Sequence, residues 1–201
     1  MHAAATAEHD ATTLGLDHRK LLMWTFLGSE CLFFGSLITT YLVYKGRSLV
    51  GPYPHEVFDI PYTSVSAFVL LMSSLTMVLA LAAIQRGDQR GLRIWLLATA
   101  LLGAIFLGGQ VYEFTVFVSE GVTLRHNLFG TTFFTLTGFH GAHVAVGVFM
   151  LLTLVGASWA GKLKPEQSLN VELVGLYWHF VDVVWIVIFT VVYLVEAPNI
   201  V

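Results

Sequence analysis

The chain has 201 residues, of which 56% are hydrophobic and only 11% are charged, and its mean hydropathy is +0.76. Soluble domains carry about 25% charged residues, so this deficit indicates a protein whose solvent is lipid. The formal net charge of −3 gives no sign of a nucleic-acid partner, and the single cysteine, Cys31, excludes an internal disulfide.

The chain begins with a polar tail over residues 1–20, rich in alanine and threonine. The tail has no basic region followed by a short apolar run, so we expect no cleavable signal peptide. Five apolar stretches follow, and each is long enough for the roughly 20 helical residues that cross a bilayer. We place them, in chain order, at residues 21–44, 63–84, 92–118, 132–159 and 171–195. Because lipid cannot satisfy backbone polar groups, we predict an all-α, five-helix transmembrane domain over residues 21–201.

Lysine and arginine are distributed unevenly between the two ends of these predicted spans. The side that carries the N-terminal tail has seven of the ten: Arg19, Lys20, Arg86, Arg90, Arg93, Lys162 and Lys164. The opposite side has Lys45, Arg47 and Arg125. Because basic residues are enriched in cytoplasmic segments, we expect a cytoplasmic N-terminus and a C-terminus on the outer side.

No lysine or arginine lies within the predicted spans, but several acids and histidines do. These residues are Glu30, Glu113, His140, His143, His179 and Asp182, with Glu172 near the cytoplasmic edge. Intramembrane ionisable groups cost at least ~2.5 kcal/mol each on insertion scales, and by default they mark function. The pairs His140/His143 and His179/Asp182 are spaced i,i+3, so the members of each pair share one helix face.

The depth of these groups follows from the helical rise. Glu30, His143 and Asp182 fall within roughly 3 Å of their helix midpoints, whereas Glu113 lies ~12 Å towards the outer side. We therefore expect the first, fourth and fifth spans to share a polar cluster near the midplane. Because desolvation disfavours a carboxylate that has no cation in reach, we predict that Glu30 is protonated at neutral pH.

Four interpretations of this polar set remain open. A metal or haem site has suitable atoms, but two histidines at i,i+3 cannot be opposite axial ligands of one haem. A di-iron site needs ligands that converge at one depth, and Glu113 lies too far out. A proton channel or transporter would use the acids, although no span is broken by proline as midplane substrate sites usually are. The other two are hydrogen bonds that fix helix packing, and contacts with a partner subunit or lipid headgroups.

Four sequence motifs resemble subunit III of the haem–copper oxidases. Residues 177–185, YWHFVDVVW, resemble the closing helix of that family, and residues 137–144, TGFHGAHV, its HG-x-H-V motif. Residues 26–30, FLGSE, resemble its first-helix motif, and Gln110-x-x-Glu113-Phe114 its third-helix motif. The resemblance covers all five spans in order, as in the short bacterial form of the subunit.

This resemblance implies an accessory subunit without redox centres or an active site of its own. Its main partner would be oxidase subunit I, which holds the haems and a copper, with subunit II in the same complex. It further implies phospholipid in a V-shaped cleft between the first two spans and the other three, and support for proton uptake and for stability of the catalytic subunit. Glu30 matches the carbodiimide-reactive carboxyl of the family. The residues expected to serve packing or lipid contact, with no metal ligand among them, are Glu113, His140, His143, Glu172, His179 and Asp182.

Arg93, Lys162 and Lys164 are candidates for binding lipid headgroups, because cations at the rim of an apolar cleft can meet phosphates. The wording of the motifs favours a cytochrome c oxidase of aerobic respiration in a bacterial inner membrane. A ubiquinol oxidase is the alternative, since cytochrome c or quinol would bind other subunits of the complex. A stand-alone proton channel or transporter is the alternative from another class.

Overall fold

The computed structural model describes residues 17–48, 58–124 and 127–195. These ranges contain five helices that are long and apolar enough to cross a membrane. They are α2 (His18–Tyr44), α4 (Ile60–Gln85), α5 (Gln89–Ser119), α6 (Leu128–Trp159) and α7 (Ser168–Ile188). A short 3-10 helix, η1 (Pro165–Gln167), precedes α7, and a π-helical segment, η2 (Phe189–Leu194), continues it. The predicted all-α class and the predicted number of spans are confirmed.

Each of these helices begins three or four residues before the predicted apolar run. Four of them start at a side chain that accepts a hydrogen bond, at 2.7–3.1 Å, from a backbone N–H of the first turn. The capping residues of α2, α4, α5 and α6 are Asp17, Asp59, Asp88 and Asn127. Because aspartate and asparagine are favourable N-caps, the helical segments extend beyond the apolar runs to these polar residues.

The turn between α4 and α5 is only three residues long, over 86–88. It closes where Gly87 adopts a φ of +75°, which is free of strain only for glycine. The N–H groups of Gly87 and Asp88 donate to the carbonyls of Ile84 and Ala83 at the end of α4. This short turn makes α4 and α5 antiparallel neighbours over their whole length.

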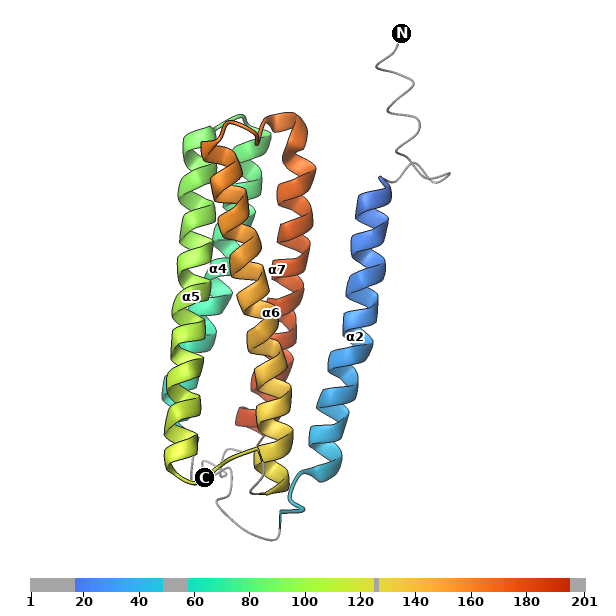
Figure 1. Ribbon diagram of the computed structural model, residues 1–201, viewed down its shortest axis with the longest axis vertical. Helices are drawn as coiled ribbons and strands as arrows, with labels where there is room; N and C mark the ends of the chain where they lie inside the picture. Colours follow the sequence, from blue (N-terminus) through green and yellow to red (C-terminus); the bar gives the residue numbers. More distant parts are fainter. Residues whose placement is uncertain (1–16, 49–57, 125–126, 196–201) are drawn as a thin grey trace.

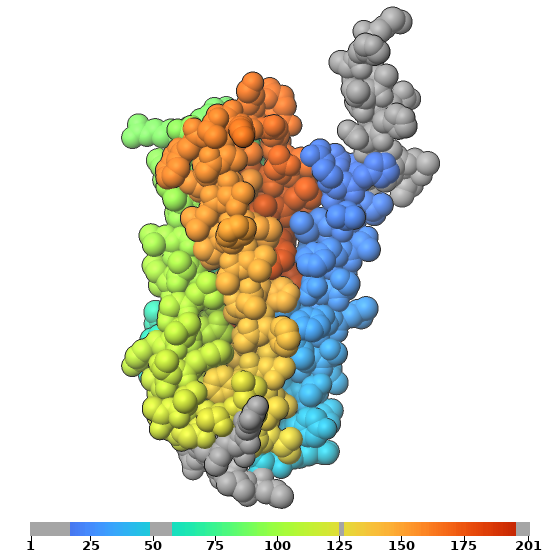
Figure 2. Space-filling view, in the orientation of Figure 1, coloured from blue at the N-terminus to red at the C-terminus, as the bar shows by residue number. Residues whose placement is uncertain are grey.

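Four of the helices, α4 to α7, form a bundle, and α2 stands beside it (Figure 1). The first span packs on α6 and α7, and the space-filling view shows it as a separate blue column along the orange and red part of the bundle (Figure 2). Its buried residues are Leu27, Phe34 and Tyr41, one every seven residues. This narrow apolar seam is the main packing contact of α2, so most of its surface faces outwards.

The prediction of a V-shaped cleft between the first two spans and the other three is wrong. The second span, α4, packs along α5 and α7 inside the bundle. Small residues such as Ala67, Ser73 and Ala80 are buried on its inner face, and they allow the neighbouring backbones to approach closely. The grooves that the fold does contain lie between α2 and the helices α6 and α7.

The indole of Trp178, on α7, joins the four bundle helices. It is fully buried and donates from Nε1 to the Ser73 hydroxyl of α4 at 2.9 Å. Its ring lies against Gly103 of α5 and Gly147 of α6, where a Cβ would come within 2.5 Å and 2.7 Å of ring atoms. These two glycines therefore form the notch that a tryptophan of this size needs.

The substitution Gly103→Ala tests this notch. We expect it to destabilise the fold by ~1–3 kcal/mol, because the added methyl group overpacks a ring that its hydrogen bond holds in place. Thermal unfolding of the purified protein in detergent measures the effect. Gly108→Ala on the same helix is the matched control, since a Cβ at Gly108 meets nothing within 4 Å. Equal unfolding temperatures of the two variants would contradict the role of the notch.

Candidate functional site

The carboxyl and the histidine predicted near the midplane are in contact. Glu30 lies in the middle of α2, and its Oε2 is 3.2 Å from Nε2 of His143 in the middle of α6. Their side chains are 17% and 19% exposed. The Tyr177 hydroxyl of α7 donates to the backbone carbonyl of His143 at 3.0 Å. Residues of α2, α6 and α7 thus meet here, although the fifth-span member of the predicted cluster is Asp182 and not Tyr177.

The hydrogen-bond partners of His143 limit where its protons can lie. Its Nδ1 is 2.7 Å from the backbone carbonyl of Phe139, and a carbonyl only accepts, so we assign a hydrogen to Nδ1. The contact between Nε2 and Glu30 then needs one proton of its own. Either a neutral Glu30 donates to a neutral imidazole, or an imidazolium donates to a carboxylate. In both forms the pair has no net charge, which a low-dielectric setting favours.

The sequence predicts a common depth for Glu30 and His143, but not this direct contact between them. His143 had been grouped with His140, three residues earlier on the same helix. The two side chains have different neighbours, because His140 turns into the bundle and stacks on Trp185 with ring centres 4.9 Å apart. His140 is fully buried, and neither of its ring nitrogens has a hydrogen-bond partner among the described residues.

Two apolar grooves flank α2. The larger, about 550 Å³, lies between α2 and α6 and has the Glu30–His143 pair in its wall. Its other lining residues are Met23, Phe26, Phe139, Ala142, Val146, Met150 and Tyr177. The smaller, about 410 Å³, lies between α2 and α7. It is lined by Trp24, Leu27, Gly28, Cys31, Leu176, His179, Phe180 and Val183. Both grooves combine apolar walls with very few polar side chains.

Glu113 lies apart from this pair, in the bundle end opposite the N-terminus. Its two carboxyl oxygens accept hydrogen bonds from the Thr63 hydroxyl of α4 at 2.8 Å and the Tyr193 hydroxyl of η2 at 3.1 Å. One turn earlier, Gln110 donates to the Thr137 carbonyl of α6 at 2.8 Å. These contacts are interhelical hydrogen bonds that fix packing. Sequence reasoning did not identify Tyr193, because its register depends on the π-helical turn of η2.

His179 and Asp182 share a face of α7, which is turned towards Ser74 of α4. The Nδ1 of His179 is 2.6 Å from the Ser74 hydroxyl of α4. Asp182 is buried in the bundle, 3% exposed, and its carboxyl oxygens have no hydrogen-bond partner among the described residues. The predicted midplane cluster therefore contains Glu30 and His143, without a direct bond to Asp182.

The remaining predicted site residues lie at the end of the fold where α2 begins. Lys20 and Glu172 form an ion pair that joins α2 to α7. The Arg93 guanidinium donates to the hydroxyl and the carbonyl of Ser158 at 3.1 Å and 2.9 Å, so it links α5 to the last turn of α6. The side chains of Lys162 and Lys164, in contrast, are exposed in the connection between α6 and α7.

Metal ligands were a further question for the described residues. Within residues 17–48, 58–124 and 127–195, no group of three or more His, Cys, Asp or Glu side chains is placed to hold a metal ion. The absence of metal ligands stays a prediction.

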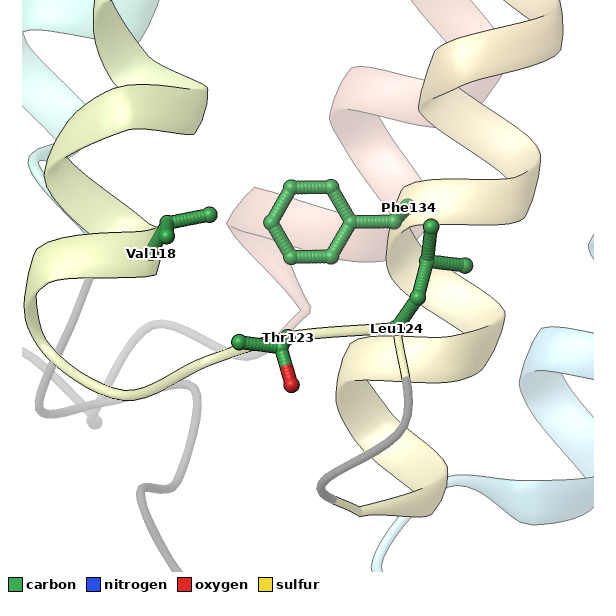
Figure 3. Close-up of a pocket in the computed structure, with 4 residues that line it drawn as sticks. All are labelled: Val118, Thr123, Leu124 and Phe134. Carbon is green, nitrogen blue, oxygen red and sulfur yellow. The ribbon is translucent and has the colours of Figure 1, made fainter.

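A pocket of about 330 Å³ lies between the end of α5 and the start of α6 (Figure 3). Its lining residues, Val118, Thr123, Leu124 and Phe134, include no titratable side chain.

The substitution Glu30→Gln tests the proton assignment of the pair. We expect infrared difference spectra between the parent and this variant to show the loss of a carboxylic-acid band. Loss of an ionised-carboxylate band instead would mean that Glu30 is the anion of an ion pair, and the predicted protonation would be wrong. Glu120→Gln, which removes a water-exposed carboxyl just after α5, is the control and should remove an ionised band.

Comparison with known proteins shows a match to the family described as cytochrome c oxidase subunit III over residues 3–197. The chain is 41% identical over 190 residues to cytochrome c oxidase subunit 3 of Bacillus sp. (strain PS3), covering 94% of this chain and 91% of that one. It is 38% identical over 195 residues to quinol oxidase subunit 3 of Bacillus subtilis (strain 168), covering 94% and 96%. With cytochrome bo(3) ubiquinol oxidase subunit 3 of Pseudomonas aeruginosa, the identity is 37% over 174 residues, covering 87% and 83%. The chain therefore belongs to the cytochrome c oxidase subunit III family.

Proposed function

We propose that this chain is the accessory third subunit of a respiratory haem–copper oxidase and has no redox centre or active site of its own. The observation that carries this proposal is the match to terminal-oxidase third subunits across nearly the whole chain. The intramembrane polar groups support it, because several of them bond to other helices of the same chain. Its partners would be subunit I, as the main contact, and subunit II. The haems and copper would lie in these partner subunits.

The grooves beside α2 support a second part of the proposal, that the subunit holds phospholipid. Their apolar walls suit acyl chains, and the larger groove has the volume for part of one chain. The exposed Lys162 and Lys164, at the end of the bundle that carries the N-terminus, suit headgroup phosphates. Arg93 is less suited, since its guanidinium is bonded to Ser158. Phospholipid in these grooves would brace α2 against the bundle and stabilise the catalytic subunit beside it.

The Glu30–His143 pair supports the part of the proposal that concerns protons. A carboxyl and an imidazole that share one proton can exchange it across 3.2 Å without placing a net charge in lipid. We propose that the pair keeps α2 in register on α6 and supports proton uptake by the catalytic subunit. The cytoplasmic N-terminus and the bacterial inner membrane, both expected from the sequence, belong to this proposal.

The electron donor is proposed to be cytochrome c, with quinol as the alternative. Relatives of both types match this chain at similar identity, because the donor binds elsewhere in such complexes. The subunit II that co-purifies with this chain decides between them. A C-x-x-x-C copper motif in that subunit supports cytochrome c, and its absence supports quinol. Proton flux through this chain alone in liposomes, without haem-containing subunits, would instead support a channel or transporter.

Turnover of the purified oxidase with Glu30→Ala tests the role of the pair. The substitution leaves His143 without its partner, a loss of ~1–3 kcal/mol, so we expect near-parental initial activity followed by inactivation on the order of tenfold faster. Oxygen consumption followed through continuous turnover measures both. Ser29→Ala is the matched control, because among the described residues the Ser29 hydroxyl bonds only to its own helix, at the Phe26 carbonyl. Durable activity of Glu30→Ala would remove Glu30 from any functional role.

A further inference from the structure

A separate recess opens at the end of the bundle opposite the N-terminus, away from the grooves beside α2. It lies between the first turn of α4 and the last turns of α5 and has a volume of about 340 Å³. Its lining residues are Asp59, Tyr62, Tyr112, Glu113, Val116 and Phe117. Among the residues that the structure describes, the lining contains two carboxyl groups and two phenol rings but no lysine or arginine, so its chemistry suits a cation.

The two tyrosines form adjacent aromatic walls of the recess. Their ring centres are 5.7 Å apart, with 55° between the planes. The hydroxyl of Tyr62 donates to the Gly109 carbonyl at 3.2 Å, and a Cβ on Gly109 would lie only 3.1 Å from that hydroxyl. This hydrogen bond holds Tyr62 against α5, where Gly109 leaves room for its ring. Tyr112 is 60% exposed, so its ring can adjust to a ligand.

The two carboxyl groups differ in how many of their oxygens already accept hydrogen bonds. Glu113 lies at the floor, and each of its oxygens accepts a hydrogen bond from a hydroxyl of the bundle. Asp59 is exposed at the mouth, and one of its oxygens caps α4 by accepting from the Tyr62 N–H at 3.1 Å. Its other oxygen accepts no hydrogen bond from the described part of the chain. The recess thus offers one free anionic oxygen beside two aromatic faces.

We propose that this recess binds an organic ammonium group, with Asp59 as its counter-charge and Tyr62 and Tyr112 as its aromatic walls. Ammonium groups are attracted to the faces of aromatic rings as well as to carboxylates. A calcium ion would need six or more oxygen ligands, and a single free carboxylate oxygen does not supply them. The ligand class is therefore an amine.

The position of the recess favours an aminophospholipid as the source of the ammonium group. Asp59 immediately precedes α4, so it lies where that helix enters the membrane, at the level of lipid headgroups. Exposed apolar side chains lie deeper in the membrane than the recess, with Val65 one turn after Tyr62 on α4 and Ile105 two turns before Tyr112 on α5. They can accompany the acyl chains of a lipid whose ammonium group occupies the recess. A free amine in solution is the other source of the same chemistry.

Binding of phosphatidylethanolamine to the intact oxidase, titrated in detergent and followed by native mass spectrometry, tests the proposal. Phosphatidylglycerol with the same acyl chains is the comparison lipid without an ammonium group. Asp59→Asn removes the charge but keeps the cap of α4, since asparagine caps helices as well as aspartate does. Tyr112→Leu removes an exposed ring independently. Glu120→Gln, an exposed acid at the same end of α5 that does not line the recess, is the control.

We expect Asp59→Asn and Tyr112→Leu each to weaken phosphatidylethanolamine binding about tenfold, with phosphatidylglycerol binding and the Glu120→Gln control unchanged. Displacement of the lipid by ethanolamine chloride, but not by potassium chloride of equal ionic strength, identifies free amines as further ligands. Failure of both salts to displace it restricts the site to the lipid headgroup. Equal phosphatidylethanolamine binding by Asp59→Asn and Glu120→Gln, or an equal loss of both lipids in either recess variant, overturns the proposal.

Discussion

Lipid offers no hydrogen bonds, so an unpaired polar side chain within a span costs free energy. Several of the intramembrane polar groups of this chain find hydrogen-bond partners on other helices. Glu113 accepts from α4 and η2, Trp178 donates to α4, and Glu30 contacts His143 of α6. These contacts fix the relative rotation of helices whose surfaces are otherwise uniformly apolar.

The same constraint explains the unusual position of α2. Only a narrow seam of apolar residues packs this helix on the bundle, and polar contacts join it at three depths. The Lys20–Glu172 ion pair lies at one end, the Glu30–His143 pair in the middle, and a hydrogen bond from the Phe129 N–H to Ser48 at the other end. A helix attached in this way leaves grooves on both sides without losing its register. That geometry is what these polar contacts produce.

The sequence predicted the spans, the fold class, the family and the common depth of Glu30 and His143. Hydropathy and helical rise predict the spans, the fold class and the common depth, whereas the resemblance of the motifs indicates the family. The N-caps account for the extra turn at the start of α2, α4, α5 and α6. The rotation of each helix about its axis could not be predicted, because an apolar surface all round gives no preferred inward face. For that reason His140 and His143 were grouped although they point to different neighbours. The predicted cleft rests on the family resemblance alone, and no residue pattern of this chain separates the first two spans from the other three.

We propose that acyl chains occupy the two grooves beside α2, with the Glu30–His143 pair in the wall of the larger groove. A phospholipid with a photoactivatable group near the middle of its acyl chain, incorporated into the intact oxidase, tests this most directly. The account predicts that peptide mapping finds cross-links concentrated on groove residues such as Met23 and Met150. Cross-links confined to the outward face of α5, at residues such as Leu101, would contradict it.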